Sequence, residues 1–277
     1  AGEPLLPEEE VRKLLKIKEG DVFSRARLTE STKAISDRLG NDGYAFANVN
    51  AAPQLDKEKR LAAFTFFVDP GRRVYVRRIN ITGNNRTRDE VIRRELRQFE
   101  GAWFSAEKVS LSKTRVDKLG YFTEVNVETP AVQGTTDQVD VNLNVTERPT
   151  GNVMAGAGFG SGEGLILSGS ISQNNIFGSG KHVSVSVNSS RINTMYALSY
   201  TDPYYTPDGV SRGFDIYMRK LDALYGGIGR YRTETLGGAL RFGVPVTEID
   251  TITYGLGYED TKITTYDDSP AFYKDYV

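Results

Sequence analysis

The chain of 277 residues has no cysteine and a single histidine, His182. The lack of cysteine excludes a disulfide framework and any thiolate metal site. One histidine leaves no Ser/His/Asp arrangement and no cluster with metal-ligand spacing. We expect His182 to be an ordinary hydrogen-bonded polar residue. The sequence therefore predicts no catalytic residue, no metal and no cofactor, and thus a protein that is not an enzyme.

Long apolar runs and an excess of charge of one sign are missing as well. No stretch approaches the roughly 18 consecutive apolar residues that a membrane-spanning helix needs. The formal net charge is -1, so overall electrostatics give no reason to expect a nucleic-acid partner.

The character of the sequence changes at Gly151. Residues 1–150 contain 25 Lys and Arg with 23 Asp and Glu, whereas residues 151–277 contain only 10 and 13. The second part holds 19 of the 28 glycines and 12 of the 15 tyrosines. A charge-poor, Gly- and Tyr-rich composition suits the wall of a barrel, in which Gly eases curvature and Tyr lies at the interface.

After Gly151 apolar residues occupy every second position, as in 183–187 and 252–258. Such alternation over about ten residues is typical of strands with one apolar and one polar face, in membrane barrels and in soluble sandwiches. The pattern predicts seven strands, at 152–160, 164–174, 181–190, 194–202, 212–221, 233–244 and 250–262.

Residues 74–147 predict one βααββ module. Strand 74–82 ends at a Gly-Asn-Asn turn, and a helix over 87–97 follows, with Thr87 and Glu90 as a capping box. A second helix over 105–119, with Ser105 as N-cap, leads to strands 122–128 and 139–145.

Residues 1–70 repeat most of this order, with helices over 7–15 and 25–39 and strands over 46–52 and 60–68. Repetition at this length indicates an array of like modules. The first module lacks an opening strand, so we expect the chain to start inside a repeat. Seven strands are also too few for a closed membrane barrel, so we expect only part of one.

An ordered series of motifs resembles the Omp85 superfamily. It consists of the segments 76–84 (VRRINITGN), 93–103 (RRELRQFEGAW), 137–141 (DQVDV), 145–151 (VTERPTG) and 201–211 (TDPYYTPDGVS). The resemblance implies α+β POTRA modules followed by an antiparallel transmembrane β-barrel, of which this chain carries about seven of sixteen strands. The implied domains are a fourth POTRA domain without its first strand (1–72), a complete fifth (73–148) and the N-terminal part of the barrel (149–277).

The resemblance also implies an outer-membrane location with periplasmic POTRA domains. The implied function is the folding and insertion of outer-membrane proteins by strand addition at the barrel seam and at POTRA edges. Implied partners are unfolded outer-membrane proteins, the lipoprotein BamD and other Bam lipoproteins, periplasmic chaperones, and outer-membrane lipid with lipopolysaccharide.

Four sets of site residues follow. The expected substrate-pairing edge is the strand with Val153, Ala155, Gly156, Ala157, Gly158 and Phe159, whose small residues offer little packing across a seam. The POTRA edge strand is represented by Phe122, Glu124, Val125 and Val127. Docking of the lipoprotein is expected at Arg93, Arg94, Arg97 and Glu100. The expected lipid-facing residues are Val183, Val185, Val187, Phe214, Ile216, Leu240, Phe242, Tyr254 and Leu256.

Two other functions remain open at this point. One is an Omp85-type polypeptide transporter, acting in two-partner secretion or autotransporter assembly. The other is a soluble periplasmic binding protein whose second half is a β-sandwich.

Overall fold

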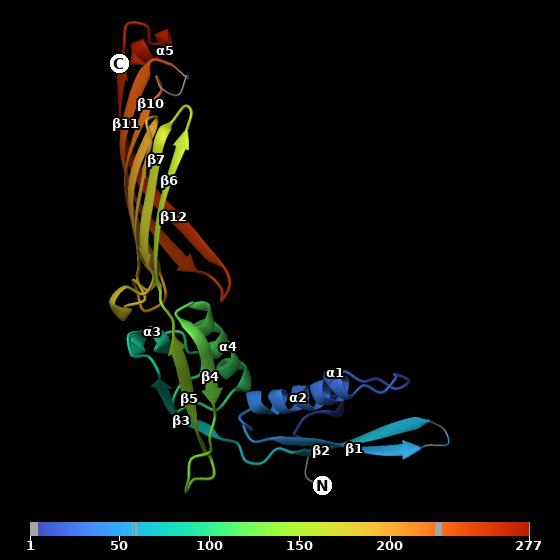
Figure 1. Ribbon diagram of the computed structural model, residues 1–277. Coiled ribbons are helices and arrows are strands. Elements are labelled where there is room, and N and C mark those ends of the chain that lie inside the picture. Colours follow the sequence, from blue (N-terminus) through green and yellow to red (C-terminus); the bar gives the residue numbers. More distant parts are fainter. Residues whose placement is uncertain (1–4, 57, 59, 225–228, 277) are drawn as a thin grey trace. The chain divides into compact units, whose positions relative to one another are not determined.

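The computed structural model describes residues 5–56, 58, 60–224 and 229–276 (Figure 1). Contacts divide the chain into two compact units. Residues 1–84 and 95–147 form unit 1, and residues 85–94 with 148–277 form unit 2. Within the described ranges, no helix has the length and apolar character needed to cross a membrane.

The first module of unit 1 is a helical layer on a two-stranded sheet. It contains α1 (Glu8–Leu14), α2 (Arg25–Asn41), β1 (Asn48–Asp56) and β2 (Leu61–Asp69). Ile35 and Leu39 of α2 are almost completely buried and pack against Val49 and Phe66 of the strands. Apolar residues four positions apart lie on one helix face, so α2 covers the sheet with that face.

The second module has a three-stranded sheet in the order β3-β5-β4. Its elements in unit 1 are β3 (Tyr75–Thr82), α4 (Ala106–Lys118), β4 (Phe122–Glu128) and β5 (Gln138–Glu147). β5 pairs parallel with β3 and antiparallel with β4. Ser105 caps α4 as predicted, because its side chain accepts a hydrogen bond from Lys108 N.

A bulge in β3 brings Arg77 against Asp140 of the central strand. The register shifts between Val76 and Arg78, and Arg77 Nε donates to Asp140 Oδ1 at 2.9 Å. These hydrogen bonds from Arg77 hold the pKa of Asp140 below its ordinary value.

The two modules use the same polar residues at equivalent places. Ser31 Oγ accepts from Lys16 N at 2.8 Å, and Ser112 Oγ accepts from Arg97 N at 2.8 Å. Both hydroxyls also donate to a carbonyl four residues earlier in their helix. The repeat predicted from the sequence is therefore present in the hydrogen bonding.

The helix predicted over 87–97 is much shorter in the structure. α3 spans only Asp89–Arg93, its N-cap is Arg88, and no side chain caps it. The capping box of Thr87 and Glu90 was therefore a wrong prediction. By its contacts, the segment 85–94 belongs to unit 2. The sequence pattern could not reveal this, because periodicity reports local structure and not the partner against which a segment packs.

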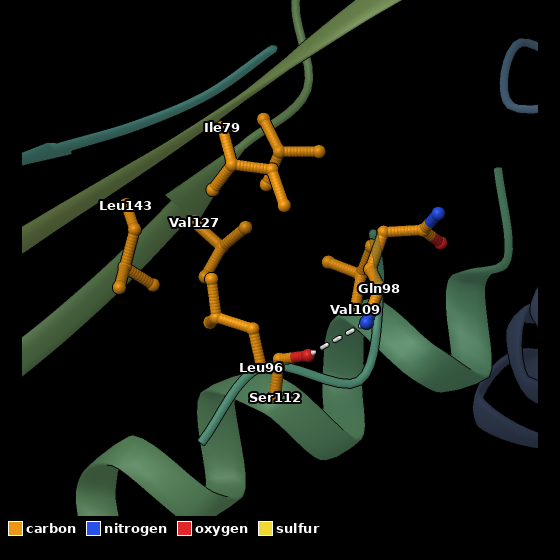
Figure 2. Close-up of a pocket in the computed structure, with 8 residues that line it drawn as sticks. Ile79, Leu96, Gln98, Val109, Ser112, Val127 and Leu143 are labelled. Carbon is orange, nitrogen blue, oxygen red and sulfur yellow. Dashed lines mark hydrogen bonds between the residues drawn. The ribbon is translucent and has the colours of Figure 1, made fainter. Parts of the chain in front are cut away.

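The chain after α3 has little regular secondary structure, and the side chain of Gln98 provides hydrogen-bond partners for its backbone. This side chain is 2% exposed; Oε1 accepts from Ser105 N at 2.9 Å, and Nε2 donates to the carbonyls of Phe99 and Trp103. Ser112 Oγ also accepts from Gln98 N at 3.3 Å (Figure 2). The buried backbone groups of this irregular stretch thus have partners.

The interior next to Gln98 is nearly filled. A cavity of about 10 Å³ lies among Ile79, Leu96, Val109, Val127 and Leu143 (Figure 2). This volume is at the lower limit for one water molecule, so the cavity has no room for a larger ligand.

Unit 2 is built on one antiparallel sheet in the order β12-β11-β10-β9-β8-β7-β6. All seven predicted strands are present, with ends shifted by a few residues. They are β6 (Gly151–Gly160), β7 (Gly164–Gln173), β8 (His182–Ser189), β9 (Asn193–Asp202), β10 (Ser211–Asp222), β11 (Tyr231–Pro245) and β12 (Thr251–Thr265). A 3-10 turn, η1 (Ile176–Gly178), joins β7 to β8, and a short helix, α5 (Ala271–Tyr276), follows β12.

Replacing Gln98 should destabilise the second module. The change Gln98→Leu removes the partners of buried backbone groups, and each unsatisfied group costs about 1–3 kcal/mol. Denaturation can be followed by the fluorescence of Trp103, the only tryptophan of the chain. Gln133→Leu, at an exposed position, is the control and should leave the transition unchanged. Equal transitions for both variants would contradict the assigned role of Gln98.

Candidate functional site

The sheet of unit 2 has one apolar and one polar face. The strand register places Val183 opposite Tyr200, Tyr200 opposite Phe214, Phe214 opposite Leu240 and Leu240 opposite Leu256. A single row of apolar side chains thus crosses five neighbouring strands. Tyr200 and Phe214 stack with ring centroids 5.0 Å apart within this row.

All nine residues predicted to face lipid lie on this apolar face. The register gives this for Val183, Val185, Val187, Phe214, Ile216, Leu240, Phe242, Tyr254 and Leu256. Several of the side chains are strongly exposed; Leu256 is 81% accessible. Among its described residues, unit 2 has no second sheet to cover this face. A large uncovered apolar surface usually marks contact with a partner or with lipid.

The opposite face carries a polar network that crosses strands. Ser199 Oγ donates to Asp215 Oδ1 at 2.6 Å, and Arg241 Nε lies 2.7 Å from Asp215 Oδ2. The Tyr217 hydroxyl donates to Glu259. The ring of Tyr217 occupies the space where a Cβ on Gly237 would lie, with Cζ at 2.3 Å from that position. Gly237 is therefore needed for the tyrosine to lie across the strands.

β6 is an end strand of this sheet. Its ten residues pair with β7 from Gly151↔Gln173 to Gly160↔Gly164, and within the described part of the chain its other edge has no strand beside it. The predicted pairing residues Val153, Ala155, Gly156, Ala157, Gly158 and Phe159 all lie on β6 and are exposed. A Cβ on Gly158 would meet nothing within 4 Å. The strand thus presents a row of backbone N–H and C=O groups with little side-chain bulk.

The predicted edge in the second module, β4, is also an end strand. Phe122 and Val125 are buried in the core, at 6% and 3% exposure, whereas Glu124 is exposed and Val127 half-buried. A strand added to β4 would therefore contact its backbone and Glu124, not the side chains of Phe122 and Val125.

The four residues predicted to dock the lipoprotein do not form one set. Arg93 and Arg94 belong to unit 2, and Arg97 and Glu100 to unit 1. Arg93 is half-exposed and forms an ion pair with Asp89. Glu100 Oε1 accepts from Ile79 N at 2.8 Å. Arg94 lies over the ring of Tyr204, with Cζ at 4.2 Å from the centroid, and its Nε and Nη2 atoms are buried.

Two residues near Arg94 were missed by the sequence reasoning. Asn175 has left-handed backbone angles, is 7% exposed, and donates through Nδ2 to Thr87 Oγ1 at 2.8 Å. Tyr204 was not among the predicted site residues, and its contact with Arg94 joins positions far apart in the sequence. An Asn at the start of a Gly-rich turn was the one available signal, since Asn tolerates this conformation.

In the described ranges, no group of His, Asp and Glu residues is placed to hold a metal ion. His182 Nδ1 lies 2.5 Å from Asn174 Oδ1, as expected for a hydrogen-bonded polar residue.

These features define a class of protein: βααββ repeat modules joined to an antiparallel sheet with one apolar face of the membrane-barrel type. The POTRA family model, described as "Surface antigen variable number repeat", matches residues 1–71 and 74–148, and the Omp85 superfamily domain matches residues 175–276. The chain belongs to the POTRA-containing Omp85 superfamily.

Relatives agree with this assignment. The chain is 40% identical over 274 residues to "Outer membrane protein assembly factor BamA" of Neisseria meningitidis serogroup B, covering 98% of this chain and 34% of that protein. BamA from Haemophilus ducreyi lacking POTRA domains 1–3 superposes with a TM-score of 0.78 at 37% identity, over 92% of this chain and 48% of that one. CdiB from Escherichia coli, at 15% identity and a TM-score of 0.51 over 98% of this chain and 51% of that one, shares the fold alone. The chain spans about a third of the length of the curated relatives it matches.

A charge on the apolar face should oppose folding into lipid. Leu198 lies opposite Val185 and Ile216 in the middle of this face. Leu198→Arg should lower the folding free energy in lipid vesicles by about 2–4 kcal/mol. Ser186→Arg, on the polar face, is the matched control and should cost much less. Equal losses in a vesicle-folding titration would show that the apolar face does not contact lipid.

Proposed function

We propose that this chain is part of the central subunit of an outer-membrane protein assembly machine, which folds and inserts β-barrel proteins by strand addition. The observation that carries the proposal is β6, an end strand of ten residues beside a sheet with a continuous apolar face. The similarity to proteins named as outer membrane protein assembly factors supports it.

The physical reason is the hydrogen-bonding demand of a strand in lipid. Each unpaired backbone N–H or C=O in the hydrocarbon region costs several kcal/mol. An incoming strand that pairs with β6 satisfies these groups as it enters the membrane. No reacting group, metal or cofactor is required for this activity, so the proposed function is not enzymatic.

The same reasoning gives the surroundings of the protein. In this proposal, the sheet of unit 2 lies in the bacterial outer membrane, with its apolar face toward lipid and lipopolysaccharide, and the POTRA modules lie in the periplasm. Unfolded outer-membrane proteins arrive there with periplasmic chaperones. The edge of β4, represented by Phe122, Glu124, Val125 and Val127, is a second place for transient strand pairing.

Docking of the lipoprotein BamD, beside other Bam lipoproteins, is proposed at charged residues of the predicted set, at Arg93 in unit 2 and at Arg97 and Glu100 in unit 1. Arg93 and Arg97 are positive, and Arg93 is half-exposed on α3. Guanidinium groups in such positions suit carboxylates of a partner. Arg94 belonged to the same predicted set, but its buried nitrogens leave it little surface for a partner.

The polypeptide transporter is the second candidate, because the polar face with Asp215 and Arg241 could line a passage. A soluble β-sandwich is disfavoured, since a sandwich needs a second sheet on the apolar face and the described part of unit 2 contains one sheet.

Photo-crosslinking in cells tests the insertion function. A probe at Ala157 on β6 should capture a nascent barrel protein, whereas a probe at Val187 should not. The register relates both positions to the same face, so they differ in lying on an end strand and on an inner strand. Capture at neither position, with secreted cargo trapped at Ser186 on the polar face, would favour the transporter.

Charge reversal at Arg93 tests the docking surface. Arg93→Glu in the full-length protein should weaken retention of BamD about tenfold, which corresponds to ~1.4 kcal/mol. Arg72→Glu is the control, since Arg72 is an exposed arginine outside the segment 85–94 and outside the predicted docking set. Co-purification from outer membranes measures the effect, and equal retention by both variants would reject the surface.

A further inference from the structure

The segment 85–94 is bound to the turn between β7 and β8 through Asn175. The Asn175 side chain donates to Thr87 Oγ1 at 2.8 Å and accepts from Gly180 N at 2.7 Å. Thr87 and Asn175 are 3% and 7% exposed. A buried side-chain hydrogen bond of this kind is costly to break, because both groups would lose their partners away from water.

The backbone of the same turn completes the contact. Arg88 N donates to the carbonyl of Gly178 at 3.0 Å, at the residue that precedes α3. A Cβ on Gly178 would lie 1.9 Å from the carbonyl oxygen of Arg86, and a Cβ on Gly180 would lie 3.1 Å from Val91 Cγ1. The two glycines thus allow an approach that a larger residue would prevent.

Arg94 joins the segment to a second turn, between β9 and β10. Its guanidinium lies over Tyr204, and Tyr204 N donates to Asp202 Oδ1 at 3.2 Å. Asp202 is 6% exposed, and Lys181 Nζ lies 3.1 Å from its Oδ2. Lys181 is the last residue before β8, so the ion pair connects the two turns with each other.

We propose that residues 85–94 form a latch on these two turns, with Arg94 as its positioning residue. Successive helical residues point about 100° apart, so α3 can direct Arg94 at the turns and Arg93 at a partner. Resting on the docking proposed above, the inference is that partner binding at Arg93 depends on the turns that hold α3.

A glycine substitution separates the latch from general strain. In the full-length protein, Gly180→Ala places a methyl group against Val91 and Arg94 at a φ of +73°. Gly164→Ala is the matched control, since its φ is +69° and its Cβ would meet nothing closer than 3.6 Å. We expect trypsin to cleave after Arg86 and Arg88 about fivefold faster in Gly180→Ala, with weaker partner retention, and neither change in Gly164→Ala.

Substitutions at Tyr204 and Tyr205 provide a second test, which decides the question if Gly180→Ala does not fold. Tyr204→Leu removes the ring under Arg94, and Tyr205→Leu removes a neighbouring ring that instead stacks with Arg212 at 3.9 Å. Tyr204→Leu should expose the segment to trypsin and weaken partner retention. Tyr204→Phe keeps the ring and should show the cleavage rate and the partner retention of the unsubstituted protein. Tyr205→Leu should change neither quantity.

Unchanged cleavage in both Gly180→Ala and Tyr204→Leu would overturn the latch. Faster cleavage with partner retention intact would show that the latch exists but does not position Arg93 for the partner. If Arg93→Glu leaves retention intact, the docking proposal fails, and the cleavage data still decide whether the latch exists.

Discussion

The need to pair every backbone N–H and C=O group governs this protein at each level. Among the described residues of unit 2, antiparallel pairing satisfies the inner strands on both sides, and the end strands on one side only. An apolar face next to an unpaired edge is an aggregation hazard in water, because the edge accepts any extended chain. In a membrane the same edge becomes a template, because an incoming strand has nothing else with which to pair. The proposed function therefore uses an exposed strand edge, a feature that soluble proteins must protect against aggregation.

In the POTRA modules, side chains pair the backbone groups that lie outside regular helices and strands. Regular helix ends soon after Arg93, and the buried backbone that follows is paired by Gln98 and Ser112. Ser31 has the equivalent role in the first module, while Ile17 stands in the position corresponding to Gln98. The shared serine pairs a backbone N–H between the helices in both repeats, and in the second repeat the glutamine pairs further backbone groups of the irregular stretch.

Sequence reasoning was most accurate where structure follows from local pattern. Strict alternation predicted the seven strands and placed residues such as Val183 and Leu256 on one face, because the side-chain period of a strand is two. Ser105 was recognised as a cap because its partner, Lys108, is three residues away. The pattern failed at 87–97, where apolar spacing favoured a longer helix and Thr87 resembled a cap. There the deciding partner, Asn175, lies far along the chain, and no local rule could identify it.

The neighbouring residues Arg93 and Arg94 show how docking and sheet structure could be linked. A partner can shift a conformational equilibrium only by binding one state more tightly than another. If α3 were held independently of the turns, a partner on Arg93 would bind equally well whatever the sheet did, and nothing would be transmitted. Because Arg94 contacts Tyr204 and Thr87 is bonded to Asn175, a rearrangement of either turn must move or release α3. Partner binding would then favour the arrangement of strands β8 and β9 that keeps α3 in place. These strands are the second and third from β6, the edge proposed to receive substrate.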